Sequence, residues 1–434
     1  SPESIDRAED RENWNHLCED LGILQPPGGT AKNFMEALEV TKKVDYPVLV
    51  RPSYVLGGRA MEIVYDDDQL KKTMEEMKRF GSLGIEGGLS AERPVLIDRF
   101  LEDATEVDVD AVRDHEGDVL IGAVMEHVEE AGIHSGDSAC VIPPPNLKEE
   151  IVTLIESHTK KIADALDVKG LINVQYAVKD NEVYVIEANP RASRTVPFVA
   201  KATGIPLAKI ASRVMMRTSL KKLREEGLLQ EAVKGDHVSV KEAVLPFNRF
   251  PEADPVLGPE MRSTGEVMGI DLTPGLAFAK SQIAAGGALP TEGTVFMSLA
   301  DRDKSSGLEA AKGFLRLGLE IVATRGTADY LEENGIHITD RVAKIGEEGT
   351  DAVRLIRSGK IQLVVNSPRG RGPRTDGDHI RGAAAAEDIP LLTTVAAALA
   401  AVKGLMDWND YPLSVRSLQE YHRGVFKSEV TENE

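Results

Sequence analysis

Short runs of alternating apolar and polar residues mark the first 200 positions, and longer amphipathic stretches separate them. Alternation predicts strands, because successive side chains on a strand point to opposite faces, at 48–51, 60–65, 95–100, 106–112, 119–128, 170–178 and 183–189. Apolar residues spaced three or four apart predict helices at 6–22, 33–44, 67–80, 148–166 and 206–216. The first part of the chain therefore has the pattern of an α+β fold.

The pattern changes twice after residue 220. Residues 220–290 contain many Pro and Gly and little periodicity, which indicates a connecting region. Strands are then predicted at 294–299, 319–323, 361–365 and 390–393, with helices between them, the clearest at 306–317. Strict alternation predicts a parallel sheet with helices on both faces and ligands at the carboxyl ends of its strands. We expect a first domain at 1–242, a connecting region at 243–286 and a last domain at 287–434.

Composition narrows the class of protein. The 434 residues suffice for two or three domains. Lys and Arg total 51 against 71 Asp and Glu, a net charge of −20, which argues against nucleic acid as the main partner because a duplex binder needs a basic footprint. The longest apolar run, at 391–402, is too short to span a bilayer, and the N-terminus has no signal-peptide pattern. Only two cysteines, Cys18 and Cys140, are present, so we expect a cytoplasmic protein without a membrane partner.

One predicted hairpin carries three oxygen donors. Gln175 lies on its first strand, and Glu187 and Asn189 share one face of the second. One carboxylate and two amides suit Mg²⁺, which takes few protein carboxylates and completes its octahedron with water and phosphate. Arg191 and Arg194 follow directly and would clamp phosphate oxygens. We expect a metal-bound nucleoside triphosphate here; the alternative is an ordinary hairpin with a polar rim.

These donors meet only if Gln175 lies opposite Glu187. A strict two-residue turn at Asp180-Asn181 would instead pair Gln175 with Ile186 and put it on the wrong face. We therefore expect either a three-residue loop, 180–182, or a β-bulge.

Two further segments suit a nucleotide. The glycine turn Gly57-Gly58, between Arg51 and Arg59, joins two strands and is therefore not a Walker loop. Its backbone N–H groups could approach phosphates closely; the alternative is a plain hairpin. Segment 98–108 runs from an apolar strand into an acidic turn. Adenine could stack on the apolar part, and Glu106 could accept from ribose hydroxyls; the alternative is a solvated acidic loop.

Loops elsewhere carry further candidate chemistry. His134, in a loop of small and hydroxyl residues, could donate a proton or contact the nucleotide, and a structural role is the alternative. In the last domain, 303–304, 323–327 and 365–372 follow strands and offer amides and hydroxyls, which bind anions at helix starts. No pair there is placed for acid–base work, so we expect sensing of a phosphorylated small molecule. Loops without a ligand are the alternative.

Together these residues resemble one family, the large subunit of carbamoyl-phosphate synthase, in its C-terminal half. Residues 1–242 are similar to the second ATP-grasp unit, and 287–434 to the methylglyoxal-synthase-like regulatory domain. The most specific runs lie at 51–62, 134–140, 189–197 and 259–268. The resemblance implies an α+β ATP-grasp domain followed by an α/β parallel-sheet, Rossmann-like domain.

The resemblance implies a ligase that phosphorylates carbamate with ATP and two Mg²⁺ or Mn²⁺ ions, giving carbamoyl phosphate for arginine or pyrimidine biosynthesis. Gln175, Glu187 and Asn189 would hold the ions, and Arg191 and Arg194, with Glu187, would act at the phosphoryl group and carbamate. The implied ATP contacts are Arg11, Arg51, Gly57, Gly58, Arg99, Leu101, Glu106, Gly132, Ile133, His134, Ser135, Gln175 and Glu187.

Allosteric control is also implied. The positions that bind the activator ornithine in some relatives correspond to Glu129, Asp137 and Glu242. The positions of the effector nucleotide, UMP or IMP, correspond to Lys304, Thr324, Thr327, Lys344 and Asn366. Pro368 stands where some relatives have a hydroxyl residue, which leaves the identity of the effector open.

The implied partners are an N-terminal synthetase half and a glutaminase small subunit. We expect the chain to be a fragment or a split-gene product that makes little or no carbamoyl phosphate from bicarbonate by itself. Two alternatives remain. Another ATP-grasp ligase is disfavoured by the regulatory domain and by the run 259–268. A nucleotide-sensing regulatory subunit is disfavoured by the complete set of metal donors.

Overall fold

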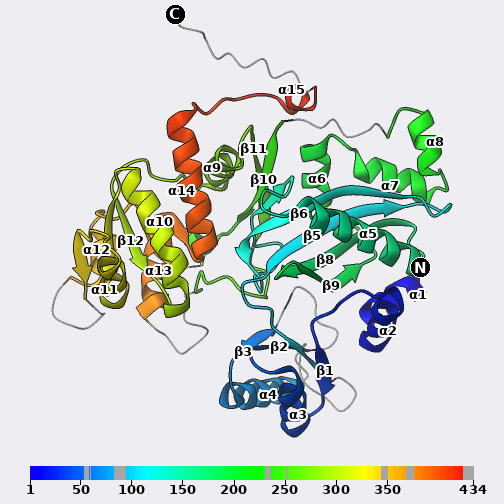
Figure 1. Ribbon diagram of the computed structural model, residues 1–434, viewed down its shortest axis with the longest axis horizontal. Helices are drawn as coiled ribbons and strands as arrows, with labels where there is room; N and C mark the ends of the chain where they lie inside the picture. Colours follow the sequence, from blue (N-terminus) through cyan, green and yellow to red (C-terminus); the bar gives the residue numbers. More distant parts are fainter. Residues whose placement is uncertain are drawn as a thin grey trace, which may run out of the picture.

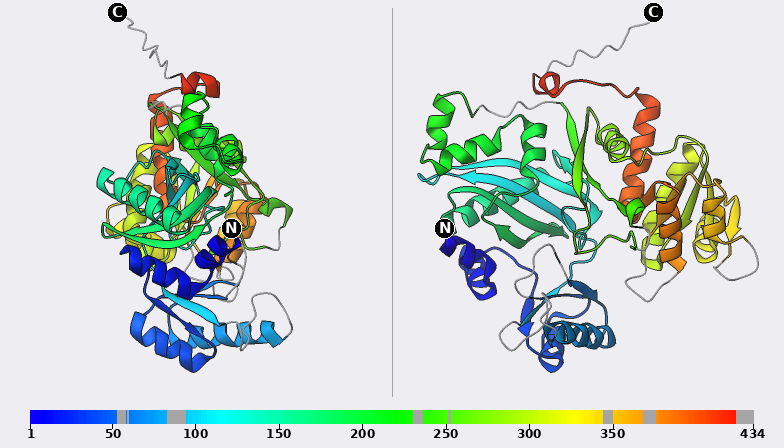
Figure 2. Two further views of the ribbon diagram at one scale, coloured as in Figure 1. Left: turned by 90° about the vertical axis from the view of Figure 1, so that its right-hand side faces the viewer. Right: turned by 180° about the vertical axis from the view of Figure 1, so that it is seen from behind.

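The computed structural model describes residues 1–52, 58, 60–82, 94–229, 236–250, 253–343, 350–367 and 376–423. They form a small antiparallel sheet, a central antiparallel sheet and a parallel sheet (Figure 1). The fold is thus an antiparallel α+β part followed by a parallel α/β domain, as the sequence predicts. Helices α9 and α14 lie between the central sheet and the parallel sheet (Figures 1 and 2).

The small sheet has the strand order β1-β4-β2-β3. Its strands are β1 (Gly28–Ala31), β2 (Val48–Pro52), β3 (Glu62–Val64) and β4 (Val95–Arg99). The helices α3 (Phe34–Val44) and α4 (Asp67–Ser82) pack against it around Val50, Leu70 and Ile97, which are fully buried. Asn33 is the N-cap of α3, because its side chain accepts a hydrogen bond from the backbone of Glu36.

The central sheet is antiparallel throughout, in the order β11-β10-β7-β6-β5-β8-β9. Its strands are β5 (Thr105–Arg113), β6 (Val119–Glu130), β7 (Cys140–Ile142), β8 (Gly170–Lys179), β9 (Glu182–Asn189), β10 (Val238–Val244) and β11 (Gly265–Asp271). Helices α2 (Arg11–Leu21) and α5 (Glu149–Ala165) cover one face. A second core packs α6 (Val196–Thr203), α7 (Leu207–Met215) and α8 (Leu220–Glu225) against the sheet.

Two expectations from the sequence are wrong. The single helix expected at 6–22 is two helices, α1 (Pro2–Glu9) and α2, because Asp10 leaves the helical conformation and caps α2 through Asn13. The region 220–290 is not irregular, since it holds α8, β10, β11 and α9 (Pro274–Ala285). Strands β10 and β11 complete one edge of the central sheet, which therefore extends past the boundary expected at residue 242.

The C-terminal sheet is parallel, in the order β14-β13-β12-β15-β16. Its strands are β12 (Thr294–Ser298), β13 (Glu320–Thr324), β14 (Asp340–Val342), β15 (Leu363–Asn366) and β16 (Leu391–Leu392). Its helices are α10 (Lys304–Arg316), α11 (Arg325–Glu333), α12 (Ala352–Arg357), α13 (Asp376–Ala386) and α14 (Val395–Asp410), and α15 (Leu418–His422) follows. Separate cores lie on its two faces, as the alternation of elements predicts. One of them continues into the central sheet through Ala139, Val141 and Val240.

Candidate functional site

The hairpin of β8 and β9 has the register that the metal site requires. Gln175 lies opposite Glu187. The turn at Asp180-Asn181 has two residues, both with positive φ (53° and 65°), so the expected three-residue loop is wrong. A register shift between Gln175 and Tyr176 leaves Ile186 as the extra residue of a bulge. The bulge, the other expected solution, brings Gln175 to the face of Glu187.

Hydrogen bonds orient the three candidate metal ligands, Gln175, Glu187 and Asn189. The Gln175 Nε2 atom donates to Ser135 Oγ at 3.1 Å, and Asn189 Nδ2 donates to Glu187 Oε1 at 2.9 Å. Within the described residues, neither Gln175 Oε1 nor Glu187 Oε2 accepts a hydrogen bond. One amide oxygen and one carboxylate oxygen therefore remain as donors for a hard cation.

The segment that follows β9 is held by a buried acid. Asp110, on β5, accepts from Ser193 Oγ and from Thr195 Oγ1, both at 2.6 Å. Burial raises the pKa of Asp110 to about 6, although these hydrogen bonds oppose the rise. The two contacts fix the backbone on both sides of Arg194. Arg191 is held separately, because its Nη2 atom donates to Asn189 Oδ1 at 3.0 Å.

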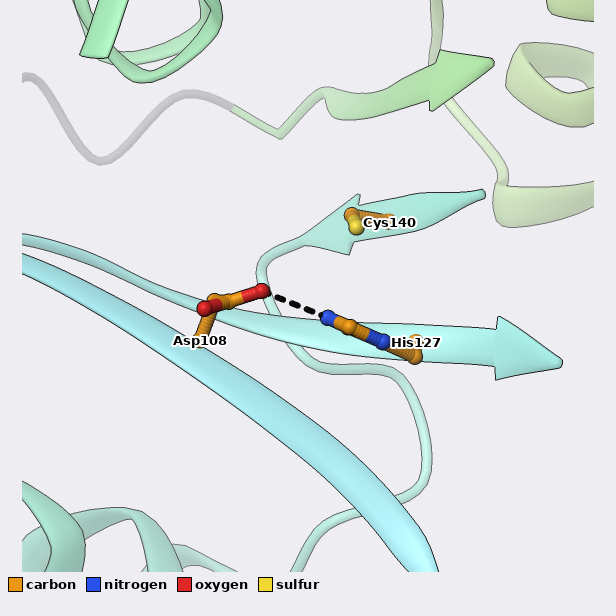
Figure 3. A group of neighbouring side chains, drawn as sticks. All are labelled: Asp108, His127 and Cys140. Atoms are coloured by element: carbon orange, nitrogen blue, oxygen red, sulfur yellow. Dashed lines mark hydrogen bonds and ion pairs between the residues drawn. The ribbon is translucent and has the colours of Figure 1, made fainter. Parts of the chain in front are cut away.

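A buried polar row crosses the same face of the central sheet. Asp108 on β5 lies opposite Gln175 and accepts from His127 Nε2 on β6 at 2.8 Å, with Cys140 of β7 beside them (Figure 3). Lys241 of β10 lies opposite Cys140, is fully buried, and donates to the Ser135 carbonyl at 3.0 Å. Burial, the largest single cause, would raise the pKa of Asp108, but the hydrogen bond and charge of His127, the hydrogen bond from Asn173 and the charge of Lys241 together outweigh it, and the pKa is lowered.

His134 is held as a neutral donor. Its Nδ1 atom accepts from the backbone of Gly136 at 3.0 Å, so the neutral ring carries its proton at Nε2. Burial lowers the pKa of His134, and the charge of Arg194 adds to this, while Asp137 opposes it. Arg194 lies close by, because a Cβ atom on Gly136 would approach its guanidinium to 1.7 Å.

The other expected nucleotide contacts have distinct surroundings. Arg11 and Arg51 both pair with Asp98, the latter at 3.2 Å. Arg99 donates to the carbonyls of Tyr46 and Val44, which hold it against the end of α3. Leu101 and Ile133 are half-buried, and Gly57 lies outside the described residues.

Glu106 joins the acidic turn to the loop that carries His134. Its Oε1 atom accepts from the backbone of Gly132 at 3.0 Å. Burial raises the pKa of Glu106, and the charge of His127 opposes this rise. The position of Glu106 therefore depends on the loop beside it, and its contact with a ribose stays a prediction.

Two of the three acids expected to bind ornithine, Glu129 and Glu242, meet where β6, β10 and α9 pack together. Glu129 accepts from the backbone of Ala139 at 2.7 Å, and Glu242 accepts from Gln282 at 2.5 Å. Burial and, after it, the charge of Glu129 raise the pKa of Glu242 to about 8. Asp137 is engaged differently, because both its oxygens accept backbone N–H groups.

We expect the stability of the chain to fall as pH rises from about 5 to about 8. Above the ordinary pKa of 4.5, the unfolded chain loses the Glu242 proton, while the folded chain keeps it up to about pH 8. The free energy of unfolding then falls by at most about 1.4 kcal/mol per pH unit from this group. Urea denaturation at several pH values should show a shallower fall in Glu242→Gln; an unchanged slope in that variant would contradict the assignment.

The residues expected to bind an effector nucleotide gather at the carboxyl ends of the parallel strands. Thr324 Oγ1 lies 3.4 Å from Ser298 Oγ and 3.3 Å from Thr327 Oγ1, and Asn366 donates to the Ser298 carbonyl at 3.3 Å. Lys304 lies over the start of α11, with Nζ 3.7 Å from the Cβ position of Gly326. Lys344 and Pro368 lie outside the described residues.

Sequence reasoning missed several members of these clusters, among them Asp108, Asp110, His127, Lys241 and Ser298. A signal existed for the first two, because an acid at every second position of β5 (Glu106, Asp108, Asp110) marks a polar face on a central strand. The pairing of His127 and Lys241 with that face depends on strands distant in sequence, and no local signal indicates it.

The two antiparallel sheets, with a hairpin that brings Gln175, Glu187 and Asn189 together, and the parallel five-stranded domain that follows them define an ATP-grasp unit with an MGS-like domain. The family described as "Carbamoyl-phosphate synthase L chain, ATP binding domain" matches residues 10–223, and the "MGS-like domain" family matches residues 306–393.

Comparisons over nearly the whole of this chain agree. The C-terminal section of the carbamoyl phosphate synthase large chain of Aquifex aeolicus is 52% identical over 97% of this chain and 80% of its own length. The chain therefore belongs to the carbamoyl phosphate synthase large-chain family and corresponds to its C-terminal section. The large chain of Archaeoglobus fulgidus is 53% identical over 97% of this chain, which spans 38% of that relative.

Among solved structures, the β,γ-ATP complex of biotin carboxylase from Campylobacter jejuni is similar at 20% identity and a TM-score of 0.47, covering 56% of this chain and 52% of that chain. Among the described residues, none of the helices has both the length and the apolar character needed to cross a bilayer.

Proposed function

We propose that this chain transfers a phosphoryl group from MgATP to carbamate, forming carbamoyl phosphate and ADP. A carbamate oxygen attacks the γ-phosphorus, and the bond to the ADP oxygen breaks. Such a transfer requires positioning and charge neutralisation more than covalent catalysis. The observation that supports the proposal most directly is the bulged register that places Gln175 opposite Glu187 with Asn189 beside it.

The donor set fits divalent ions. Two ions, Mg²⁺ or Mn²⁺, would be held by Gln175 Oε1 and Glu187 Oε2 and by the second lone pair of Asn189 Oδ1, which also accepts from Arg191, and would neutralise phosphate charge. Arg191 and Arg194 would stabilise the charge that spreads over the transferring oxygens. His134, with its proton on Nε2, would donate a hydrogen bond to a phosphate oxygen. The loop that contains His134 and the glycine turn at Gly58 would exclude water, from which carbamate must be kept.

The remaining parts of the proposal concern partners and control. An N-terminal section and a glutaminase would supply carbamate, which agrees with the match to a separate C-terminal section in A. aeolicus. Ornithine would bind near Glu129, Asp137 and Glu242, and UMP or IMP at the cluster of Thr324, Thr327 and Asn366. A cytoplasmic location is part of this proposal and agrees with two free, buried cysteines.

The reverse reaction tests the proposal with the chain alone. The purified chain, given MgADP and carbamoyl phosphate, should form ATP. A chain that binds UMP or IMP but forms no ATP would instead be a sensing subunit, and this result would overturn the proposed activity.

We expect Gly136→Ala to reduce this rate by about 10–100-fold, because displacement of a positioning group by about 1 Å has effects of that size. The added Cβ would overlap the Arg194 guanidinium at the end of a flexible side chain, so the arginine moves and the fold stays intact. Gly265→Ala is the matched control, since nothing lies within 4 Å of its Cβ position. Equal rates for the two variants would exclude Arg194 from the site.

A further inference from the structure

An extended segment, residues 253–263, runs between β10 and β11. It contacts both the parallel domain, beside the proposed effector cluster, and the loop that carries His134. We name it the strap. It contains no helix or strand, yet polar contacts to other elements fix it at both ends. One end meets the parallel domain and the other meets the loop that carries His134.

Arg381 of α13 grips the first end of the strap. Its side chain is 3% exposed, and its Nε and Nη2 atoms donate to the two oxygens of Asp254 at 2.8 and 2.7 Å. The same guanidinium donates through Nη1 to Asn366 Oδ1 at 2.7 Å and through Nη2 to Asp378 at 2.6 Å. One buried arginine thus joins the strap to a residue of the proposed effector cluster.

The other end of the strap holds the catalytic loop, residues 134–137. The Gly258 carbonyl accepts from the backbone of His134 at 2.8 Å. Asp137 accepts from the backbone of Arg262 at 2.7 Å and of Ser263 at 2.9 Å, and Ser263 Oγ donates to the Gly136 carbonyl at 3.0 Å. Within this loop, Ser135 Oγ accepts a hydrogen bond from Gln175, one of the candidate metal ligands.

We infer that the Asp254–Arg381 pair couples effector binding at Asn366 to the geometry of the catalytic loop, with Asp254 as a positioning residue that acts through the strap. The inference rests on the proposed function of both sites. An effector that engages the Asn366 side chain alters the acceptor on which Arg381 depends. The bidentate pair then carries that change into Asp254, because a planar guanidinium fixes the direction of both bonds.

Geometry favours the strap as the coupling element. Asp254 and Gly258 are four residues apart, so their Cα atoms are at most about 14 Å apart. Burial by itself would raise the pKa of Asp254, but the hydrogen bond and charge of Arg381, with the hydrogen bonds of Asp378 and of the Val256 backbone, together lower it. A polar contact between the parallel domain and the small sheet, Arg302 Nη1 to Tyr65 at 3.2 Å, is exposed, and exposed contacts couple weakly.

The test uses the full chain and measures the dissociation constant of MgADP by calorimetry with and without UMP, and with and without IMP. Allosteric coupling commonly changes such constants by about 5–150-fold. The coupling ratio is the dissociation constant of MgADP without the effector divided by that with it. In Asp254→Asn we expect this ratio, for the active effector, to fall to within about 2-fold of one. The effector's own affinity should persist, because Arg381 keeps Asp378 and Asn366. Glu309→Gln, an exposed acid of the same domain paired with Lys312, should keep the wild-type ratio.

A double variant tests whether the strap acts in series. Ser263→Ala releases the far end of the strap from Gly136, so it should also reduce the ratio. Adding it to Asp254→Asn should then have little further effect, a non-additivity expected when two changes interrupt one path. Thermal melts before calorimetry verify that each variant is folded.

The outcomes separate this inference from the proposed function. ATP formation from MgADP and carbamoyl phosphate by the wild-type chain supports the function whatever the coupling shows. If ATP forms but Asp254→Asn keeps the wild-type ratio, or if neither UMP nor IMP shifts MgADP affinity in the wild-type chain, the coupling role of the strap is overturned.

Discussion

Glu187→Ala should reduce ATP formation from MgADP and carbamoyl phosphate by at least about 100-fold, since loss of one preorganised charge-stabilising group typically lowers a rate by about 10²–10³-fold. Glu187 is the one carboxylate among the three donors. The change also removes the acceptor that holds Asn189 Nδ2 at 2.9 Å, so two of the three donors are affected. Initial rates with saturating Mg²⁺ measure the effect.

Two further variants separate charge from shape. Glu187→Gln keeps an oxygen that can accept from Asn189 but removes the charge, so it should be nearly as slow as Glu187→Ala. Glu182→Ala is the control, because Glu182 lies on the same strand, is exposed, and bonds only Tyr184 among the described residues. UMP or IMP binding should persist in all three. A Glu187→Gln variant with wild-type rate would mean that the carboxylate holds no cation.

The hairpin illustrates what sequence determines and where it stops. Alternation along the chain assigns Glu187 and Asn189 to one face, and it shows that Gln175 joins them only with a three-residue loop or a β-bulge. The sequence does not indicate which of the two forms. Asp180 and Asn181 both adopt positive φ, which suits a tight two-residue turn. Because the turn has only two residues, the extra residue lies within the strand, and the structure places it at Ile186, next to the site.

The edge of the central sheet shows a second limit. Strand β10 carries Lys241 and Glu242 at buried positions, so its sequence lacks the apolar alternation on which strand prediction depends. Its partner β7 lies about 100 residues earlier in the sequence, and its partner β11 is separated from it by the strap. Neither pairing therefore has a local sequence signal. Polar residues at buried positions are expected at functional sites, where local rules are broken for chemical reasons.

Residue type alone also does not indicate which partners the arginines bind in the folded chain. Arg51 and Arg99 both lie near the ends of predicted strands, and the family resemblance implies the same role, contact with ATP, for both. In the structure, Arg51 pairs with Asp98, whereas Arg99 is engaged by backbone carbonyls at the end of α3. Carbonyl partners have no sequence signature, because every residue carries one.

Lys241→Met should lower the free energy of unfolding by about 3–5 kcal/mol, the usual effect of removing one partner from a buried charge cluster. Lys241 is fully buried, and its charge lowers the pKa values of Asp108, Glu129 and Glu242. Without it, those acids lose their shared cation and the Ser135 carbonyl loses its donor. Urea denaturation measures the change, and the exposed Lys222→Met should stay within about 0.5 kcal/mol of wild type.

The same variant also tests the path from Lys241 to the metal donors. Lys241 holds the Ser135 carbonyl, and Ser135 Oγ accepts from Gln175 Nε2, so the amide of Gln175 on β8 depends on a lysine four strands away in the sheet. Measured at a temperature where Lys241→Met is fully folded, ATP formation should still be reduced by about 10–100-fold, because the donor is displaced. A folded variant with an undiminished rate would show that the strap alone positions Ser135, and that the buried lysine stabilises the sheet without serving the site.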